Sequence, residues 1–403
     1  MSNKVLRCLA ICALGVAFAT SSIAAMAVSG PFPEPLIAEK PLGSLIYDGS
    51  TSGRIQSAGD TESYTLPVNT GETITVDVTT DASLQATVSV TDPNGNLIGV
   101  ATAAADGQEV LLLTVPAGTT GTYTITVGGA NSTTGNFTAK LTLNATLDTG
   151  AHGGPENSTL ATAQDLNSSA FALTSMADRA AVVGHFDGTD DFYSFSLQAG
   201  QVSSLALELA SNASVTLELE DANGNVLAIG VGGAQNVSAI IQDFVATVAG
   251  TYYARLTGTG QSDYSLIVTR SADFELEPND QSHPQSLDVT HTVLAYVGNN
   301  GTVQPDTDWY SFNVNAGDNL ALSTATPSDQ GGEFHNNLFP QINLYDSNFV
   351  LVASNQGRPK NTPVFYTTLF AGTYFAQVSG AQGPTARNGF GEYVLEIQGA
   401  TGP

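Results

Sequence analysis

The sequence predicts an all-β protein built of tandem β-sandwich or barrel domains, and three observations lead to this prediction. Short segments rich in Thr and Val alternate between apolar and polar residues, and turn residues separate them at intervals of about 8–12 residues. One strand motif occurs three times, at intervals of the size of a domain. No convincing helical periodicity appears after residue 27.

The repeated motif is an acidic residue followed by an alternating strand and a glycine turn. In its third occurrence the strand carries Tyr310, Phe312 and Val314 on one face, because side chains alternate along a strand with a period of two. In every occurrence an acid stands two residues before a Tyr, and a Gly follows that Tyr seven residues later. The three occurrences are residues 62–71, 191–200 and 308–317.

The first 27 residues are predicted to be a secretory signal peptide. Lys4 and Arg7 precede an apolar run that is too short to span a bilayer, and residues 25–27 fit a small-x-small cleavage site. Both cysteines, Cys8 and Cys12, lie in this segment, so the mature chain is expected to have no disulfide. We therefore expect a secreted protein that is periplasmic, attached to the cell surface or extracellular.

The repeat sets the expected domain boundaries. Residues 28–44 are rich in proline and should form an extended leader. Domains are expected at residues 45–146, 156–271 and 272–400; a Gly-rich linker precedes the second, and the third begins with an acidic linker at residues 272–284. The strands expected in the first domain are 63–68, 73–79, 86–91, 110–115, 123–127 and 137–143.

A second repeated element is a turn built on Asp and Asn. In the second domain Asp221, Asn223 and Asn225 alternate like calcium ligands, but the bidentate Glu expected at the twelfth position of such a loop is missing. Asn-Gly between two alternating strands is a strong hairpin signal, so a hairpin turn is favoured.

Further acids and amides gather at the start of the repeated strand and in the linker before it. The candidate ligands of the third domain are Glu275, Glu277, Asn279, Asp280, Asp306 and Asp308, and those of the second are Glu156, Asn157, Asp190 and Asp191. Ca²⁺ takes about six to eight oxygen ligands, so a linker folded back over the strand could complete a site. The alternative is that these residues cap turns and face water. The first domain has Asp60 and Glu62 but no acidic linker, so no strong site is expected there.

Four other residues are candidates for ligand binding. Trp309 points away from Tyr310 by strand alternation, and it could form an aromatic platform or pack against a neighbouring segment. Arg358, Lys360 and Arg387 lie in long insertions of the third domain, at 356–363 and 382–388; a further insertion covers 328–340. Loops at one end of a sandwich commonly bind ligands, although these insertions could also be tolerated loop length.

Charge and composition argue against two classes of function. The formal net charge is −26, so a phosphate backbone would be repelled and nucleic acid is not an expected partner. The histidines are His152, His185, His283, His291 and His335; none forms an H-E-x-x-H motif, and no G-x-S-x-G elbow occurs. We therefore expect a protein that is not an enzyme.

Several motifs resemble the bacterial pre-peptidase C-terminal domain. They are Glu277-Pro278-Asn279-Asp280, Asp308-Trp309-Tyr310-x-Phe312, Ala371-Gly372-Thr373-Tyr374 and, in the second domain, Asp191-Phe192-Tyr193-x-Phe195. The resemblance implies jelly-roll-like antiparallel sandwiches like the collagen-binding domain of bacterial collagenases, in which linker acids and strand-start acids hold Ca²⁺. No protease domain is present here, which puts a role as a proteolytic appendage in doubt.

These observations lead to one functional hypothesis and two alternatives. The hypothesis is a secreted, non-catalytic repeat protein that binds an extracellular polymer or a surface protein, with Ca²⁺ at the domain linkers and no transmembrane segment in the mature chain. The first alternative is a structural spacer of the cell surface. The second is an accessory protein of a hydrolase.

Overall fold

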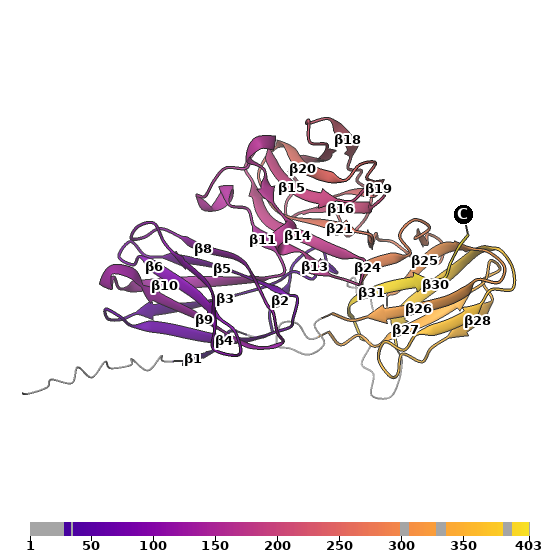
Figure 1. Cartoon of the computed structure of the whole chain (residues 1–403), viewed down its shortest axis with the longest axis horizontal. Helices are drawn as coiled ribbons and strands as arrows, with labels where there is room; N and C mark the ends of the chain where they lie inside the picture. Colours follow the sequence, from indigo (N-terminus) through magenta and orange to yellow (C-terminus); the bar gives the residue numbers. More distant parts are fainter. Residues whose placement is uncertain (1–27, 34, 299–305, 328–335, 382–388, 403) are drawn as a thin grey trace, which may run out of the picture.

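The computed structural model describes residues 28–33, 35–298, 306–327, 336–381 and 389–402, and within them it is almost entirely β-structure (Figure 1). The strands form six sheets, which pack in pairs around three separate hydrophobic cores. This arrangement confirms the predicted all-β fold of tandem sandwiches. The predicted signal peptide, residues 1–27, lies outside the described residues.

The first sandwich contains two five-stranded sheets and one short 3₁₀ helix, η1 (Ala130–Ser132). The first sheet has the order β1 (Val28–Pro31), β4 (Thr61–Val68), β9 (Gly121–Gly129), β6 (Ala86–Thr91) and β7 (Leu97–Thr102). The second sheet has the order β2 (Ile37–Ala38), β3 (Tyr47–Ile55), β10 (Gly135–Leu143), β5 (Thr73–Thr80) and β8 (Val110–Pro116).

The second sandwich repeats this plan with three additional 3₁₀ turns. Its first sheet has the order β11 (Thr146–Leu147), β14 (Asp178–Phe186), β21 (Ser262–Arg270), β16 (Val202–Leu209) and β19 (Ala239–Val245), and β13 (Phe171–Ala172) also pairs with β14. Its second sheet has the order β12 (Gln164–Asp165), β15 (Asp191–Leu197), β20 (Gly250–Thr259), β17 (Ser214–Glu220) and β18 (Val226–Ile229). The turns are η2 (Gly150–His152), η3 (Leu160–Thr162) and η4 (Asn167–Ser169).

The third sandwich has the same strand order again. One sheet has the order β22 (Asp273–Phe274), β24 (Thr292–Val297), β31 (Gly391–Gln398), β26 (Asn319–Ala325) and β29 (Val364–Thr367). The other has the order β23 (Gln285–Ser286), β25 (Thr307–Val314), β30 (Gly372–Gly380), β27 (Pro340–Tyr345) and β28 (Leu351–Ser354). The first sandwich differs at one edge, because β2 is antiparallel to β3 whereas β11 and β22 run parallel to β14 and β24.

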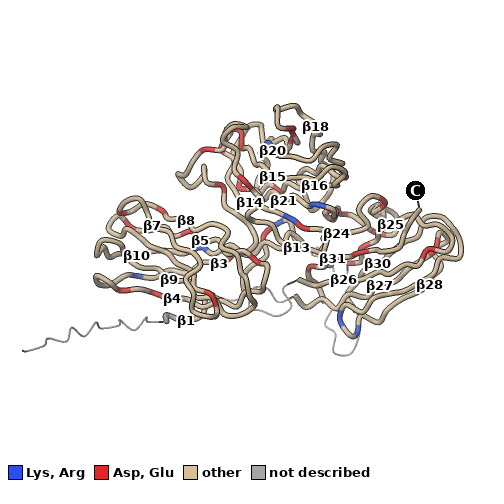
Figure 2. Tube along the Cα trace, in the orientation of Figure 1, with Lys and Arg blue, Asp and Glu red and all other residues tan. Residues whose placement is uncertain are grey.

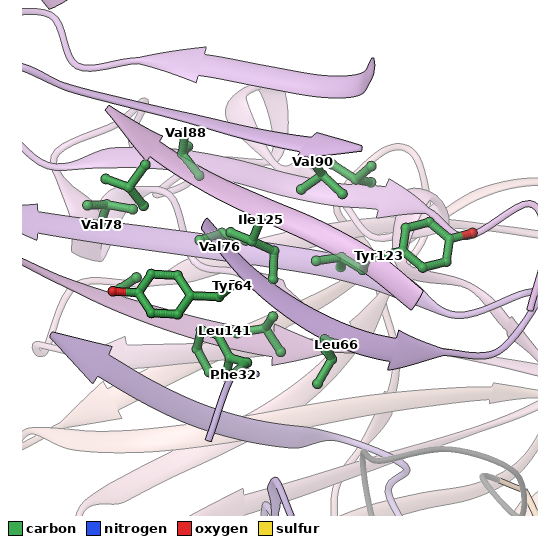
Figure 3. Packing of buried hydrophobic residues seen from close by; sticks show 14 of the residues in the cluster. Phe32, Tyr64, Leu66, Val76, Val78, Val88, Val90, Tyr123, Ile125 and Leu141 are labelled. Carbon is green, nitrogen blue, oxygen red and sulfur yellow. The ribbon is translucent and has the colours of Figure 1, made fainter. Parts of the chain in front are cut away.

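Strand alternation produces each core. In β4 the side chains of Tyr64, Leu66 and Val68 point between the two sheets, where residues from β5, β6, β9 and β10 meet them (Figure 3). Tyr193 and Tyr310 hold the corresponding places in the second and third sandwiches and are fully buried. Burying one large apolar side chain contributes roughly 1.5–3 kcal/mol, so each of these recurring positions helps to stabilise its sandwich.

The described residues of the proline-rich segment 28–44 contribute strands β1 and β2 to the first sandwich, and residues 41–44 form a turn. β1 pairs in parallel with β4, and the backbone N–H of Phe32 donates to the carbonyl of Thr65 at 2.8 Å. Phe32 is fully buried and packs edge-on against Tyr64, with ring centroids 6.0 Å apart (Figure 3).

The Asp-initiated turns close β-hairpins in all three sandwiches, as predicted. They join β6 to β7, β17 to β18 and β27 to β28. In each turn the Oδ1 atom of Asp92, Asp221 or Asp346 accepts the N–H groups two and four residues later, at 2.8–2.9 Å. The carboxylate therefore holds the turn itself.

The three sandwiches meet at one buried junction (Figure 1). Its apolar part combines Leu45 and Ile46 of the first sandwich with residues of the second, such as Ile267, and with Phe274 and Leu294 of the third. The polar part of this junction contains two buried charged side chains, Arg179 and Glu392. Arg179 of β14 donates to the carbonyls of Leu45, at 2.9 Å, and Asn144. Glu392 of β31 accepts from the Tyr47 hydroxyl and from the N–H of Leu45.

Among the described residues, the helices are all too short to form a membrane-spanning segment.

Candidate metal centre

The acidic linker of the third sandwich folds back over the start of β25, as the sequence suggested. The N–H of Glu275 donates to Leu294 at 3.1 Å, which continues the pairing of β22 with β24. The N–H of Trp309 donates to the carbonyl of Asn279 at 2.7 Å, so the linker is fastened to β25. The second sandwich uses the same contact, from the N–H of Phe192 to the carbonyl of Asn157 at 2.8 Å.

This fold brings three carboxylates of the third sandwich together. One oxygen from each of Glu275, Glu277 and Asp308 lies within 4.8 Å of the others. The exposed fractions of these residues are 2%, 9% and 0%, respectively. A cavity of about 310 Å³ adjoins the cluster, and its lining includes Glu275, Glu277, Asp306 and, from the other two sandwiches, Lys40 and Asn236.

The hydrogen bonds of the cluster leave one buried oxygen without a donor. Glu275 accepts from the Tyr310 hydroxyl at 2.8 Å, from the Asn279 amide at 2.7 Å and from the Tyr296 N–H at 2.8 Å. Oδ2 of Asp308 accepts from the Tyr393 hydroxyl, but Oδ1 has no partner among the described residues. Buried carboxylate oxygens are normally bonded, so this oxygen has room either for a proton or for a cation.

The electrostatics of the cluster also favour a cation. Burial, together with the charge of Glu277, raises the pKa of Glu275 to about 8. Burial, together with the charge of Asp306, raises the pKa of Glu277 to about 7. The pKa of Asp308 lies well above its usual range, chiefly because of burial and then because of the Glu275 charge. A bound divalent cation would stabilise all three carboxylates in their ionised form.

The other predicted ligands of the third sandwich divide into two groups. Asn279 and Asp306 lie at the cluster: Asn279 is buried and bonded to Glu275, and Asp306 lines the same cavity as Glu277. Asp280 is exposed and accepts the N–H groups of Ser282 and His283 at 2.8 and 3.0 Å. Asp280 therefore caps a turn, which was the alternative interpretation.

The second sandwich holds a corresponding cluster around Gly150. A methyl group placed on Gly150 would lie 3.3 Å from Oε2 of Glu156, 3.4 Å from Oδ1 of Asn157 and 3.5 Å from Oδ1 of Asp148. These three oxygens therefore converge on a small space beside the glycine. Asp191 of β15 lies close enough to Asp148 to feel its charge: burial and the charge of Asp148 raise the pKa of Asp191 to about 7.

Asp190 does not join this cluster. Its carboxylate pairs with Arg255 at 2.6 Å, and Arg255 also approaches Glu218 and Glu220, at 3.2 and 3.4 Å. Arg255 lies on β20, and Glu218 and Glu220 lie on β17. The carboxylate of Asp190 is therefore paired with a guanidinium and is not a free metal ligand. In the first sandwich, Glu62 accepts from the Tyr64 hydroxyl at 2.8 Å, and Asp60 accepts the N–H of Gln56 at 3.2 Å.

Sequence reasoning missed Asp148 as a candidate ligand. It follows β11 as Glu275 follows β22, and both strands run parallel to the next long strand of their sandwich. Aligning Thr146-Leu147-Asp148 with Asp273-Phe274-Glu275 would have revealed it. Two further residues of these clusters are Tyr264 and Tyr393, whose hydroxyls donate to Asp191 and Asp308.

Both clusters fit Ca²⁺ by the chemistry of their donors. Every candidate atom is a carboxylate or amide oxygen, which is the ligand type that Ca²⁺ takes in proteins. The unpartnered Oδ1 of Asp308 and the space beside Gly150 mark where such an ion would meet the chain.

The candidate ligand-binding residues lie elsewhere. Trp309 is only 5% exposed and stacks on Tyr345 with ring centroids 5.0 Å apart, which favours a packing role over a platform. Arg358 and Lys360 both lie over the ring of Phe339, at 4.8 and 5.4 Å from its centroid. Arg387 lies outside the described residues. Basic residues are sparse in all three sandwiches, whereas acidic residues occur throughout (Figure 2).

Comparison with known proteins supports the resemblance for the third sandwich. Residues 306–380 match the sequence model of the bacterial pre-peptidase C-terminal domain. This segment begins at Asp306 and covers β25 to β30. No curated protein matches the chain.

Solved structures show only distant likeness. A periplasmic inhibitor of g-type lysozyme from Aeromonas hydrophila is 16% identical over 27% of this chain and 95% of its own, with a TM-score of 0.22. A putative secreted protein from Eubacterium rectale is 11% identical over 55% of this chain and 73% of its own, with a TM-score of 0.18. Tandem CBM51 modules of a Streptococcus pneumoniae glycoside hydrolase are 10% identical over 54% and 82%, with a TM-score of 0.17. With TM-scores this low, these structures do not bear on the ligand or activity of this chain.

Proposed function

We propose that this chain is an exported, non-catalytic protein in which Ca²⁺ at the linkers of the second and third sandwiches orders a binding surface for an extracellular polymer. The observation that carries the calcium part is the buried cluster of Glu275, Glu277 and Asp308, with one oxygen of Asp308 lacking a partner. The match of residues 306–380 to a domain family of exported bacterial proteins supports the extracellular part.

The calcium part is tested by thermal unfolding with Ca²⁺ and with a chelator. Extracellular calcium modules bind with Kd of roughly 10⁻⁴–10⁻³ M. At about ten times Kd the ion adds about 1.4 kcal/mol, which raises Tm by a few degrees. Asp308→Asn keeps the shape of the side chain and removes its charge, so we expect the variant to lose the part of this shift that comes from the third sandwich.

Asp280→Asn is the matched control, because Asp280 belongs to the same linker but caps a turn outside the cluster. We expect it to retain the full calcium response. An unchanged response in Asp308→Asn, or no response in the wild type, would reject a calcium site at this position.

The structural-spacer function is the second candidate, and the buried junction is the observation that favours it. Fourteen buried apolar residues from all three sandwiches form one cluster there, so the sandwiches are fixed relative to one another as a spacer requires. Retention on insoluble collagen, chitin or cellulose separates the two functions. Retention that needs Ca²⁺ supports polymer binding, whereas self-assembly without retention supports the spacer.

A further inference from the structure

A different cluster lies where the first and second sandwiches touch. Asp77 belongs to β5, Glu109 directly precedes β8, and His152 ends the turn η2 that follows β11. One potential ligand atom from each lies within 4.8 Å of the others. Nδ1 of His152 is 2.8 Å from Oε1 of Glu109, so the contact joins two sandwiches through their side chains.

Asp77 is buried, and one oxygen of its carboxylate lacks a hydrogen-bond donor in the described part of the chain. It is 7% exposed, and its Oδ1 has no hydrogen-bond partner among the described residues. Burial and the neighbouring Glu109 raise the pKa of Asp77 to about 7. Lys140 lies opposite Asp77 on β10, but its ammonium pairs with Asp48 at 3.0 Å. No N–H or hydroxyl group of another described residue therefore donates to this oxygen, and the carboxyl groups of Asp77 and Glu109 face each other closely enough to share a proton or to hold a cation between them.

We propose that Asp77, Glu109 and His152 bind a divalent transition-metal ion of the Zn²⁺ type, and that this ion fastens the first sandwich to the second. An imidazole nitrogen with two carboxylates suits Zn²⁺, which takes nitrogen and oxygen ligands at about 2.0–2.2 Å. Ca²⁺ prefers oxygen ligands only, so this cluster differs in chemistry from those at Gly150 and Asp308.

Three protein ligands leave a coordination position open for water or another ligand. His152 lines a groove of about 680 Å³ between the first two sandwiches, together with Lys140, His185 and Asp263. His152 lines this groove whereas Asp77 and Glu109 do not, so water or a small ligand would approach the ion from the side of the imidazole. A ligand with a carboxylate or another anionic donor is the class that would complete the coordination.

The experiment measures metal binding to the full mature chain in saturating Ca²⁺, which keeps the oxygen-only clusters occupied. Zn²⁺ affinity is measured by calorimetry, and Co²⁺ is added as a probe whose visible absorption reports a site of low coordination number. We expect stoichiometric Zn²⁺ binding by the wild type. We expect His152→Ala and Glu109→Gln each to weaken it by about tenfold or more, by analogy with changes around known metal sites.

His185→Ala is the control, because His185 lines the same groove and pairs with Asp263 at 2.6 Å instead. Its Zn²⁺ affinity should equal that of the wild type. Glu109→Gln keeps the proposal testable if His152→Ala does not fold. Absence of Zn²⁺ binding by the wild type, equal affinity in the wild type and folded Glu109→Gln, or an equal loss in His185→Ala would each overturn the proposal.

Discussion

An acid two residues before a core tyrosine must point into the sandwich, because both lie on the same face of an alternating strand. Asp308 shares this face with Tyr310, and Asp191 shares it with Tyr193. In both cases a tyrosine of the opposite sheet donates to one oxygen of the acid. Burying the remaining charge is costly unless a cation or a proton balances it. The position of one side chain therefore explains why a metal site is expected at the strand start.

Adding a single methyl group at Gly150 tests the candidate calcium site of the second sandwich. Gly150→Ala would place a methyl group 3.3–3.5 Å from the oxygens of Asp148, Glu156 and Asn157. We expect it to block Ca²⁺ at this site and to change Tm in chelator by only a few degrees. Calorimetric titration should then count one calcium ion fewer than in the wild type.

Gly118→Ala is the matched control for this change. A methyl group there would meet no atom within 4 Å, so the count of bound calcium should stay at the wild-type value. An unchanged count in Gly150→Ala would show that the space beside this glycine is not the binding position.

Pairs of tyrosines link the two sheets in the second and third sandwiches but not in the first. Tyr310 of β25 and Tyr393 of β31 lie with their hydroxyls 2.8 Å apart, and Tyr193 and Tyr264 make the same contact. In the first sandwich, Phe137 of β10 holds the corresponding place and has no hydroxyl. The sandwich without an acidic linker thus also lacks the tyrosine of the opposite sheet, and its acid Glu62 is held instead by Tyr64 of its own strand.

Replacing Tyr393 by Phe should therefore make the third sandwich resemble the first. The change removes the donor to Asp308 and leaves a buried carboxylate without any partner among the described residues. Loss of such a bond typically costs about 1–3 kcal/mol, so we expect the free energy of unfolding of the third sandwich to fall by this amount in chelator. Denaturant titration measures it.

Added Ca²⁺ should recover part of this loss, because the ion would satisfy the same carboxylate. Tyr123→Phe is a suitable comparison, since the Tyr123 hydroxyl donates at 2.7 Å to the carbonyl of Thr119, far from any acidic cluster. If Tyr393→Phe were as stable as the wild type in chelator, the tyrosine would not hold Asp308 in the folded chain.

How far the strands could be predicted depended on their periodicity. In the first sandwich, residues 63–68, 73–79 and 86–91 alternate clearly and correspond to β4, β5 and β6. Two strands had no such signal: β3 is rich in Ser and Gly, and β7 exposes its apolar residues Leu97 and Val100. Their pairing with β10 and β6 places them in the sheets, and no local pattern reports that pairing.

The metal clusters were only partly predictable for a related reason. The linker acids and Asp308 could be found because the motif repeats, whereas the partnership of Asp77 with His152 depends on contact between two sandwiches. Asp190 and Asp191 are neighbours in sequence, yet Asp190 pairs with Arg255 whereas Asp191 accepts from the buried Tyr264 hydroxyl. Strand alternation alone would have separated the two.

The strands of the second sandwich show how the three sandwiches are packed against one another. Its strands β14 and β21 carry consecutive apolar residues, such as Ile267 beside Leu266, because one face fills the core and the other fills the junction. Such continuous runs are typical of strands buried on both faces. Arg179 adds a buried cation, whose pKa is lowered to about 10 by burial, so it remains charged at neutral pH. Among the neighbouring charges, that of Glu392 does most to raise the pKa of Arg179, and Arg179 in turn lowers the pKa of Glu392.

Glu392→Gln should change how the stability of this junction depends on pH. Burial raises the pKa of Glu392 from 4.5 to about 7 in the folded chain. Folding therefore takes up a proton between these two pH values, and the contribution of Glu392 to stability is full below pH 4.5 and declines until pH 7 is passed. We expect the wild type to lose stability across this window and Glu392→Gln to lose less of it, as measured by denaturant titration at several pH values.

Glu396→Gln, on the same strand β31, controls for the loss of one carboxylate. It should follow the wild-type pH dependence, because its side chain takes no part in the contacts of Tyr47 and Leu45 with Glu392.

Arg179→Met tests the other buried charge of the junction. It removes the hydrogen bonds that the guanidinium donates to the carbonyls of Leu45 and Asn144, at a typical cost of about 1–3 kcal/mol for each buried acceptor left unpaired, and should split the unfolding into separate transitions as the sandwiches lose their common junction. A single transition at the wild-type Tm in Arg179→Met would mean that the apolar cluster alone joins the three sandwiches.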